Sequence, residues 1–136
     1  MAFSKGINRW PYPWATDWLA KRISEHEVYL ASVSGIIVGT VVVQWSDKGI
    51  WDDMPNNAGY IHQMAVRRNF AGQGLRSELL RWAEKHIASE NKQLARLNCW
   101  SDNPKLCAYY EKAGYIFQRT VTTKYGWSLN LYEKEI

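Results

Sequence analysis

Runs of β-branched and aromatic residues recur along this chain and predict several short strands. Val28–Val33 and Ile36–Trp45 are two such runs, and Ser34-Gly35 between them is the two-residue signal of a hairpin turn. A third run covers Tyr60–Arg67. The polar segment Asp47–Asn57 is rich in turn residues and predicts a loop before that strand.

Apolar residues at helical spacing predict one helix at Trp14–Glu25 and a longer one after Gly74. The longer helix has a continuous apolar stripe, and its charged residues are expected to face away from the core. The stripe comprises Leu75, Leu79, Leu80, Ala83 and Ile87, and the outward residues are Glu78, Arg81, Glu84 and Lys85.

A short third helix is predicted after a strand at Leu94–Trp100. Asn103 stands at its N-cap and Pro104 occupies its first helical position, where the missing N–H costs nothing. Gly114 is expected to end this helix, because glycine readily adopts the left-handed conformation of a helix C-terminus.

Two final strands, Tyr115–Lys124 and Trp127–Tyr132, complete the pattern. A chain of 136 residues can bury one core, so we expect a single domain over residues 1–136. Strands outnumber helices. The sequence therefore predicts an α/β fold of the α+β type, with a mixed, largely antiparallel central sheet flanked by helices.

Composition excludes several classes of protein. The chain is 46% hydrophobic and lacks any run of about 18 apolar residues, so no membrane partner is expected. No signal peptide is visible, which favours a cytoplasmic protein. The net charge of +4 is scattered and Arg67-Arg68 is no basic patch, so we expect no nucleic-acid partner. Cys99 and Cys107 favour free, buried thiols over a disulfide, and the scattered histidines predict no metal site.

The third strand leads into Gly72-Gln73-Gly74 at the start of the long helix. Such a turn can bind an anion, because unpaired N–H groups and the positive helix end converge there. A tight connection without any ligand is the alternative. The phosphate loop of nucleotide hydrolases is excluded because no Gly-Lys-Ser/Thr follows, and Ser77 excludes the dinucleotide-binding pattern.

The surroundings of this turn carry a resemblance. Met64-Ala65-Val66 precede it, and Asn103 and Tyr110 follow within the segment NPKLCAYYEKAGY. With this order of elements the chain resembles the GNAT superfamily of N-acetyltransferases. The resemblance covers about residues 28–117 and implies the acyl-CoA N-acyltransferase fold, with acetyl-CoA as cosubstrate.

In that family the strand before the turn splays from the next strand, and the pantetheine arm binds there like an added strand. The resemblance implies that backbone groups of Met64, Ala65 and Val66 hold the arm and polarise the thioester oxygen. It assigns the pyrophosphate to Gly72, Gln73, Gly74, Leu75, Arg76 and Ser77, and adds Asn103 and Tyr110 to the cofactor-binding residues. Ala71 and Arg76 depart from the family turn Q/R-x-x-G-x-G/A.

Two catalytic roles are implied by the resemblance. Tyr110 would protonate the departing CoA thiolate, a transfer between groups with pKa values of about 10 and 8.5; the alternative is a core tyrosine. His62 would take the proton of the substrate ammonium, as in arylalkylamine acetyltransferases, or is simply a hydrogen-bonded histidine beside the pocket. Asn98 stands where several protein N-terminal acetyltransferases have a glutamate, and it cannot accept a proton.

These residues favour acetyl transfer to a primary amine of a small molecule. A protein or peptide N-acetyltransferase and a non-catalytic acyl-CoA-binding regulatory domain are the alternatives. The acidic residues Asp47, Asp52 and Asp53 either attract the ammonium or are solvated loop carboxylates. The first strand and helix usual in the family are expected to be missing. We therefore expect an open sheet edge covered by a second copy, as a homodimer.

Overall fold

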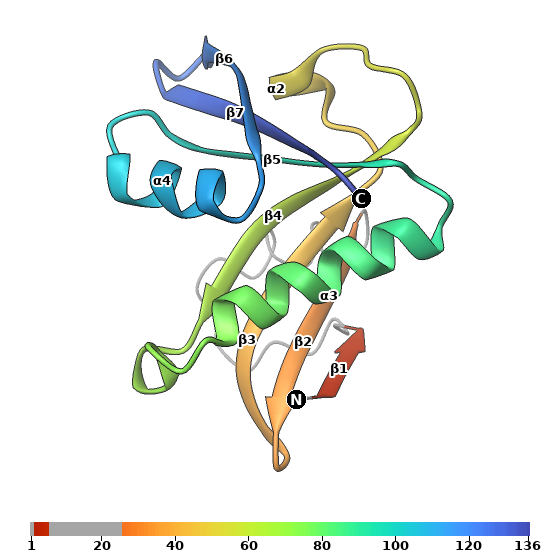
Figure 1. Cartoon of the computed structure of the whole chain (residues 1–136), viewed down its shortest axis with the longest axis vertical. Coiled ribbons are helices and arrows are strands. Elements are labelled where there is room, and N and C mark those ends of the chain that lie inside the picture. The colour runs from red at the N-terminus through yellow and green to blue at the C-terminus, as the bar shows by residue number, and fades with distance from the viewer. Residues whose placement is uncertain (1, 6–25) are drawn as a thin grey trace. The chain divides into compact units, whose positions relative to one another are not determined.

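The computed structural model describes residues 2–5 and 26–136 (Figure 1). By its contacts the chain divides into two compact units, each discontinuous in sequence. The first unit combines Met1–Gln44 with His62–Ala83, and the second combines Trp45–Ile61 with Glu84–Ile136. Strand β4, Ala58–Val66, and helix α3, Leu75–Ser89, each pass from one unit into the other.

The first unit is built on antiparallel strands. β2, Glu27–Val33, and β3, Ile36–Gln44, form the predicted hairpin, which pairs from Glu27 opposite Val43 to Val33 opposite Ile36 with one shift of register between Ala31 and Ser32. Ser34 and Gly35 both have positive φ, 51° and 80°. Two successive left-handed residues are the geometry of a type I′ turn, whose twist matches that of the flanking strands.

The expectation of a missing first strand is wrong. Ala2–Lys5 form β1, which pairs antiparallel with β2 from Ala2 opposite Ser32 to Lys5 opposite Tyr29. The edge of β2 is therefore already hydrogen-bonded, so the open edge on which the homodimer was predicted is not present there. The helix predicted at Trp14–Glu25 lies outside the described residues.

The second unit holds the remaining strands. β5, Leu94–Trp100, lies parallel to β4, and the order β4-β5-β7-β6 continues with antiparallel pairs. β6 is Ile116–Thr122 and β7 is Ser128–Glu135, close to the predicted bounds. Helix α4, Pro104–Lys112, packs against β5 (Figure 1). The mixed, largely antiparallel sheet is confirmed.

The predicted loop before β4 is partly helical. Helix α2, Lys48–Trp51, forms a single turn, and Trp51 is only 1% exposed. Its indole packs in a cluster with Ala58, Tyr60 and Leu131. Burial of this large ring, rather than local propensity, holds the turn, because four residues cannot form a stable isolated helix.

The predicted apolar stripe of α3 is buried at all of its five positions, and Glu78, Arg81 and Lys85 are exposed as expected. Glu84 is a correction: its side chain is only 12% exposed and bonds to Tyr115 and Lys134. No helix among the described residues is both long and apolar enough to cross a membrane.

Candidate functional site

The carboxyl half of β4 departs from regular strand geometry. Gln63 has a φ of 48°, a left-handed residue inside a strand, which is typical of a β-bulge. Among the described residues, the parallel pairing of β4 with β5 covers Ala58 to Tyr60, and β4 continues to Val66. His62 is half-buried immediately before Gln63, and Met64 follows Gln63.

Strand β3 fixes the position of the end of β4. A Cβ placed on Gly39 would lie 2.8 Å from the carbonyl oxygen of Ala65, a distance that real side chains do not adopt. Glycine at this position therefore allows the two backbones to approach closely. Arg67 continues the contact, because its backbone N–H donates to the Val38 carbonyl at 2.7 Å.

The glycine turn lies at the N-terminus of α3, after a 3₁₀ turn η1 at Arg68–Phe70. Gly72 and Gly74 have φ of 81° and 75°, which L side chains rarely adopt, so both glycines are required by the backbone. Both are exposed, with open space where a Cβ would stand. The 15-residue helix α3 therefore begins at an open, exposed turn, and the N-terminus of a helix is where an anion site is expected.

The side chains around this turn divide into buried and exposed ones. Leu75 is buried and Ser77 is half-buried, whereas Gln73 and Arg76 are exposed. Ala71 is exposed as well. This candidate phosphate site is therefore formed mainly by backbone groups, and Arg76 adds a cationic side chain next to them.

Helix α4 begins as the sequence predicts. The Oδ1 atom of Asn103 accepts the backbone N–H of Leu106 at 3.2 Å, and Pro104 follows the cap. Two turns later Tyr110 is 8% exposed, with its ring centroid 5.4 Å from that of Tyr109 and 6.0 Å from that of Tyr115. Tyr110 is therefore held edge-on between two other rings, which limits the directions its hydroxyl can take.

A polar network supports Tyr115, the residue that packs on Tyr110. The Tyr115 hydroxyl donates to Glu84 Oε2 at 2.7 Å, and Lys134 Nζ lies 3.1 Å from Glu84 Oε1. Lys134 Nζ also stands 5.6 Å from the centre of the Tyr115 ring. Burial, and then the neighbouring Glu84 carboxylate, raise the pKa of Tyr115 well above its usual value, so its hydroxyl remains a donor.

The two cysteines lie on β5 and α4, as expected, but they also touch. Their Sγ atoms are 3.3 Å apart, and both thiols are free and buried. Burial, and then the hydrogen bond to Cys107, raise the pKa of Cys99 to about 12. Because the thiolate is the nucleophile, Cys99 is unsuited to form an acetyl-cysteine intermediate near neutral pH.

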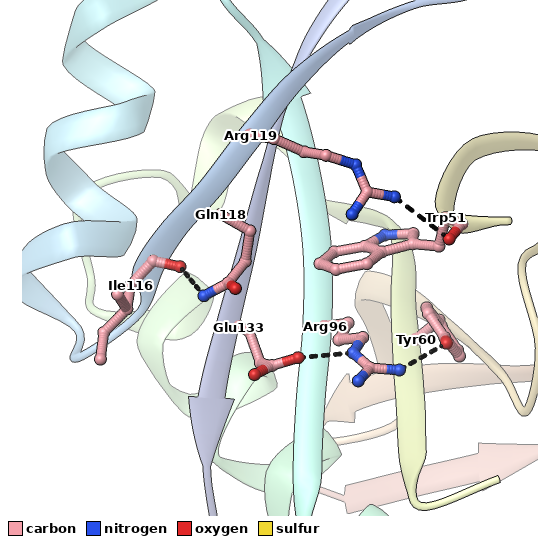
Figure 2. A network of polar contacts seen from close by, with 7 residues as sticks. All are labelled: Trp51, Tyr60, Arg96, Ile116, Gln118, Arg119 and Glu133. Atoms are coloured by element: carbon pink, nitrogen blue, oxygen red, sulfur yellow. Dashed lines mark hydrogen bonds and ion pairs between the residues drawn. The ribbon is translucent and has the colours of Figure 1, made fainter. Parts of the chain in front are cut away.

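Sequence analysis missed a buried arginine at the last β4–β5 pair. Arg96 donates through Nε to Glu133 Oε2 and through a terminal nitrogen to the Tyr60 hydroxyl, both at 2.7 Å. Figure 2 shows the Trp51 indole between the guanidinium groups of Arg96 and Arg119, whose central carbons lie 5.2 and 5.9 Å from the ring centre. This network fixes β4, β5 and β7 together where the parallel pairing ends.

The acidic residues before β4 have cationic neighbours. Asp52 lies 3.7 Å from Arg119 and Asp53 lies 3.3 Å from Lys48, and both carboxylates are largely exposed. Asp47 stands at the N-cap position of α2. These contacts agree better with solvated loop carboxylates than with a preformed ammonium site, since exposed ion pairs contribute little energy.

The chain belongs to the acetyltransferase (GNAT) family, because the model of that family matches residues 3–115. It is 39% identical over 94 residues to YesJ of Bacillus subtilis (strain 168), described as an uncharacterised N-acetyltransferase. That match covers 68% of this chain, and the chain spans about half, 49%, of the relative's length.

Solved structures share the fold. A GNAT acetyltransferase from Elizabethkingia anophelis, solved with acetyl-CoA bound, is 15% identical with a TM-score of 0.74, covering 99% of this chain and 97% of that one. A variant of the spermidine N-acetyltransferase SpeG from Vibrio cholerae is 10% identical with a TM-score of 0.75, covering 99% and 95%. At such low identity these likenesses establish the fold alone.

Proposed function

We propose that the protein transfers the acetyl group of acetyl-CoA to a primary amine of a small molecule. The observation that carries this proposal is the open glycine turn at the N-terminus of α3, which follows a strand with a left-handed residue at Gln63. Phosphates suit the first element and a peptide-like pantetheine arm suits the second.

In this proposal the backbone of Met64, Ala65 and Val66 binds the pantetheine arm. The residues from Gly72 to Ser77, with the Arg76 side chain, bind the pyrophosphate. Two features support these roles: the backbone of Ala65 approaches Gly39 of β3 closely, and both glycines of the turn have positive φ with open space where a Cβ would stand.

The reaction is a direct attack on the thioester. The amine nitrogen bonds to the carbonyl carbon, the C–S bond breaks, and the CoA thiolate takes the proton of the Tyr110 hydroxyl. On becoming an amide the nitrogen releases its second proton, which through solvent restores the Tyr110 hydroxyl. His62 removes the proton that the substrate ammonium must lose before it attacks, because such amines have pKa values of about 10. The raised pKa of Cys99 supports a scheme without a thiol intermediate.

A small acceptor is favoured over a protein or peptide. Asn98, half-buried on β5, cannot replace the glutamate that serves as base in several protein acetyltransferases. One neighbour of similar fold is a spermidine acetyltransferase, which is a precedent for amine chemistry on this scaffold.

The test is thiol release from acetyl-CoA with a panel of polyamines, arylalkylamines, aminosugars and a peptide with a free N-terminus. We expect turnover with at least one small amine. In Tyr110→Phe we expect a kcat lowered about 10²–10⁴-fold with CoA affinity nearly intact, because the ring stays and only a proton donor is lost. Turnover with the peptide alone would support the protein acetyltransferase instead. CoA binding without turnover of any amine would support the regulatory domain.

A further inference from the structure

Packing in the core of the second unit does not require the hydroxyl of Tyr115. Tyr115 is 2% exposed, and a phenylalanine would fill the same volume. The hydroxyl instead makes a 2.7 Å hydrogen bond to Glu84 of α3, a residue 31 positions away in sequence. A buried tyrosine hydroxyl needs such a partner, so the pair fixes the ring as well as satisfying it.

Tyr115 is joined to Tyr110 by two contacts. Its backbone N–H donates to the Tyr110 carbonyl at 3.0 Å, and the two rings meet edge to face at 6.0 Å with an angle of 71° between their planes. An edge-to-face contact depends on orientation, so a shift of one ring changes the position of the other.

Lys134 completes the support. Its Nζ atom lies 3.1 and 3.2 Å from the two oxygens of Glu84, which balances the charge of a carboxylate that is largely buried. The lysine stem passes over Gly114, where a Cβ would lie 3.3 Å from Lys134 Cε. Helix α3, strand β7 and the end of α4 are thus joined at one point in the second unit.

We infer that Tyr115, held by Glu84 and Lys134, is a positioning residue for the hydroxyl of Tyr110. The inference rests on the proposed function, in which Tyr110 is the proton donor to the CoA thiolate. Tyr115 is only 2% exposed, so it is assigned no contact with substrate or cofactor. Its hydrogen bond sets the angle of its ring, and the ring sets the place of its neighbour.

The experiment is a double-mutant cycle on kcat with Tyr115→Phe and Tyr110→Phe. Tyr115→Phe alone should lower kcat about 10- to 100-fold, the range for a misplaced catalytic group, while the KM for acetyl-CoA stays within about twofold. In the Tyr110→Phe background the same change should have no further effect, because the group it positions is gone. Tyr125→Phe, the same chemical change at a residue 67% exposed, is the matched control and should behave as wild type.

Two variants of Glu84 provide a second test of the inference. Glu84→Gln retains an oxygen that can accept the hydrogen bond of the Tyr115 hydroxyl and should keep kcat within about threefold of wild type, whereas Glu84→Ala should match Tyr115→Phe. These variants test the inference even if Tyr115→Phe fails to fold.

Three results would overturn the inference: a wild-type kcat in Tyr115→Phe, an equal loss in both backgrounds of the cycle, or a loss of acetyl-CoA binding in parallel with kcat. A wild-type rate in Tyr110→Phe alone is a different failure, because it removes the proposed proton donor rather than its support.

Discussion

Gly39→Ala is the most direct test of how β3 supports the candidate cofactor strand. The added Cβ would lie 2.8 Å from the Ala65 carbonyl oxygen and 3.1 Å from Leu79 Cδ1. The leucine methyl can rotate, but the carbonyl belongs to the backbone of β4, so the strand itself must shift. Overpacking of this kind costs about 1–3 kcal/mol. For a chain of 136 residues that corresponds to a fall in Tm of about 4–12 °C.

The same shift moves the backbone that we propose binds pantetheine, so CoA affinity should fall as well. Thermal unfolding gives Tm, and calorimetric titration of the folded protein at low temperature gives the Kd for CoA. Gly49→Ala is the control, because a Cβ there meets nothing within 4 Å and alanine favours the helix. A Gly39→Ala variant with wild-type Tm and Kd would refute the close approach. A lowered Tm with an unchanged Kd would show that the backbone of Ala65 does not bind the cofactor.

Other predictions follow from the same features. Gly74→Trp should weaken CoA binding at least tenfold in calorimetric titration, because it fills and strains the turn; unchanged heat would contradict the phosphate site. His62→Ala should lower the rate at neutral pH and matter less near the amine pKa of about 10, since free amine needs no base; a pH–rate profile checks this. Burial favours the neutral thiol of Cys99, so the stability that this thiol contributes is complete below pH 9 and is lost as the pH rises towards 12. In urea titrations the free energy of unfolding of Cys99→Ala should therefore fall less over that pH range than that of the wild type. The homodimer stays a prediction, and light scattering that gives a monomer at micromolar concentration would contradict it.

Local sequence patterns predicted most of the described elements, because they depend on neighbours a few residues apart. The β2–β3 hairpin followed from Ser34-Gly35, and the α3 stripe followed from helical spacing. Helix α2 was missed because it forms only when Trp51 is buried against residues distant in sequence. Strand β1 was missed because four residues carry too short a pattern to be read as a strand.

The candidate site was predictable where a residue type has one dominant structural use. Gly72 and Gly74 indicated a turn at the start of the long helix, and Asn103 before a proline indicated an N-cap. The left-handed conformation of Gln63 was not predictable, because a non-glycine residue with positive φ gives no local signal. Glu84 was assigned to solvent by helical periodicity, which cannot register a partner such as Tyr115 from another element.

Arg96 shows what such a long-range contact contributes. Taking a guanidinium out of water costs about as much as its ion pair returns, so the net gain in stability from this residue is small. Its value is geometric: the fork of donors reaches Tyr60 on β4 and Glu133 on β7 at the last position where β4 and β5 pair. An aliphatic side chain could fill that space, but it would make no directed hydrogen bond to either neighbouring strand. The directed hydrogen bonds accept one register, and that register sets where β4 leaves its partner and begins the segment proposed to bind acetyl-CoA.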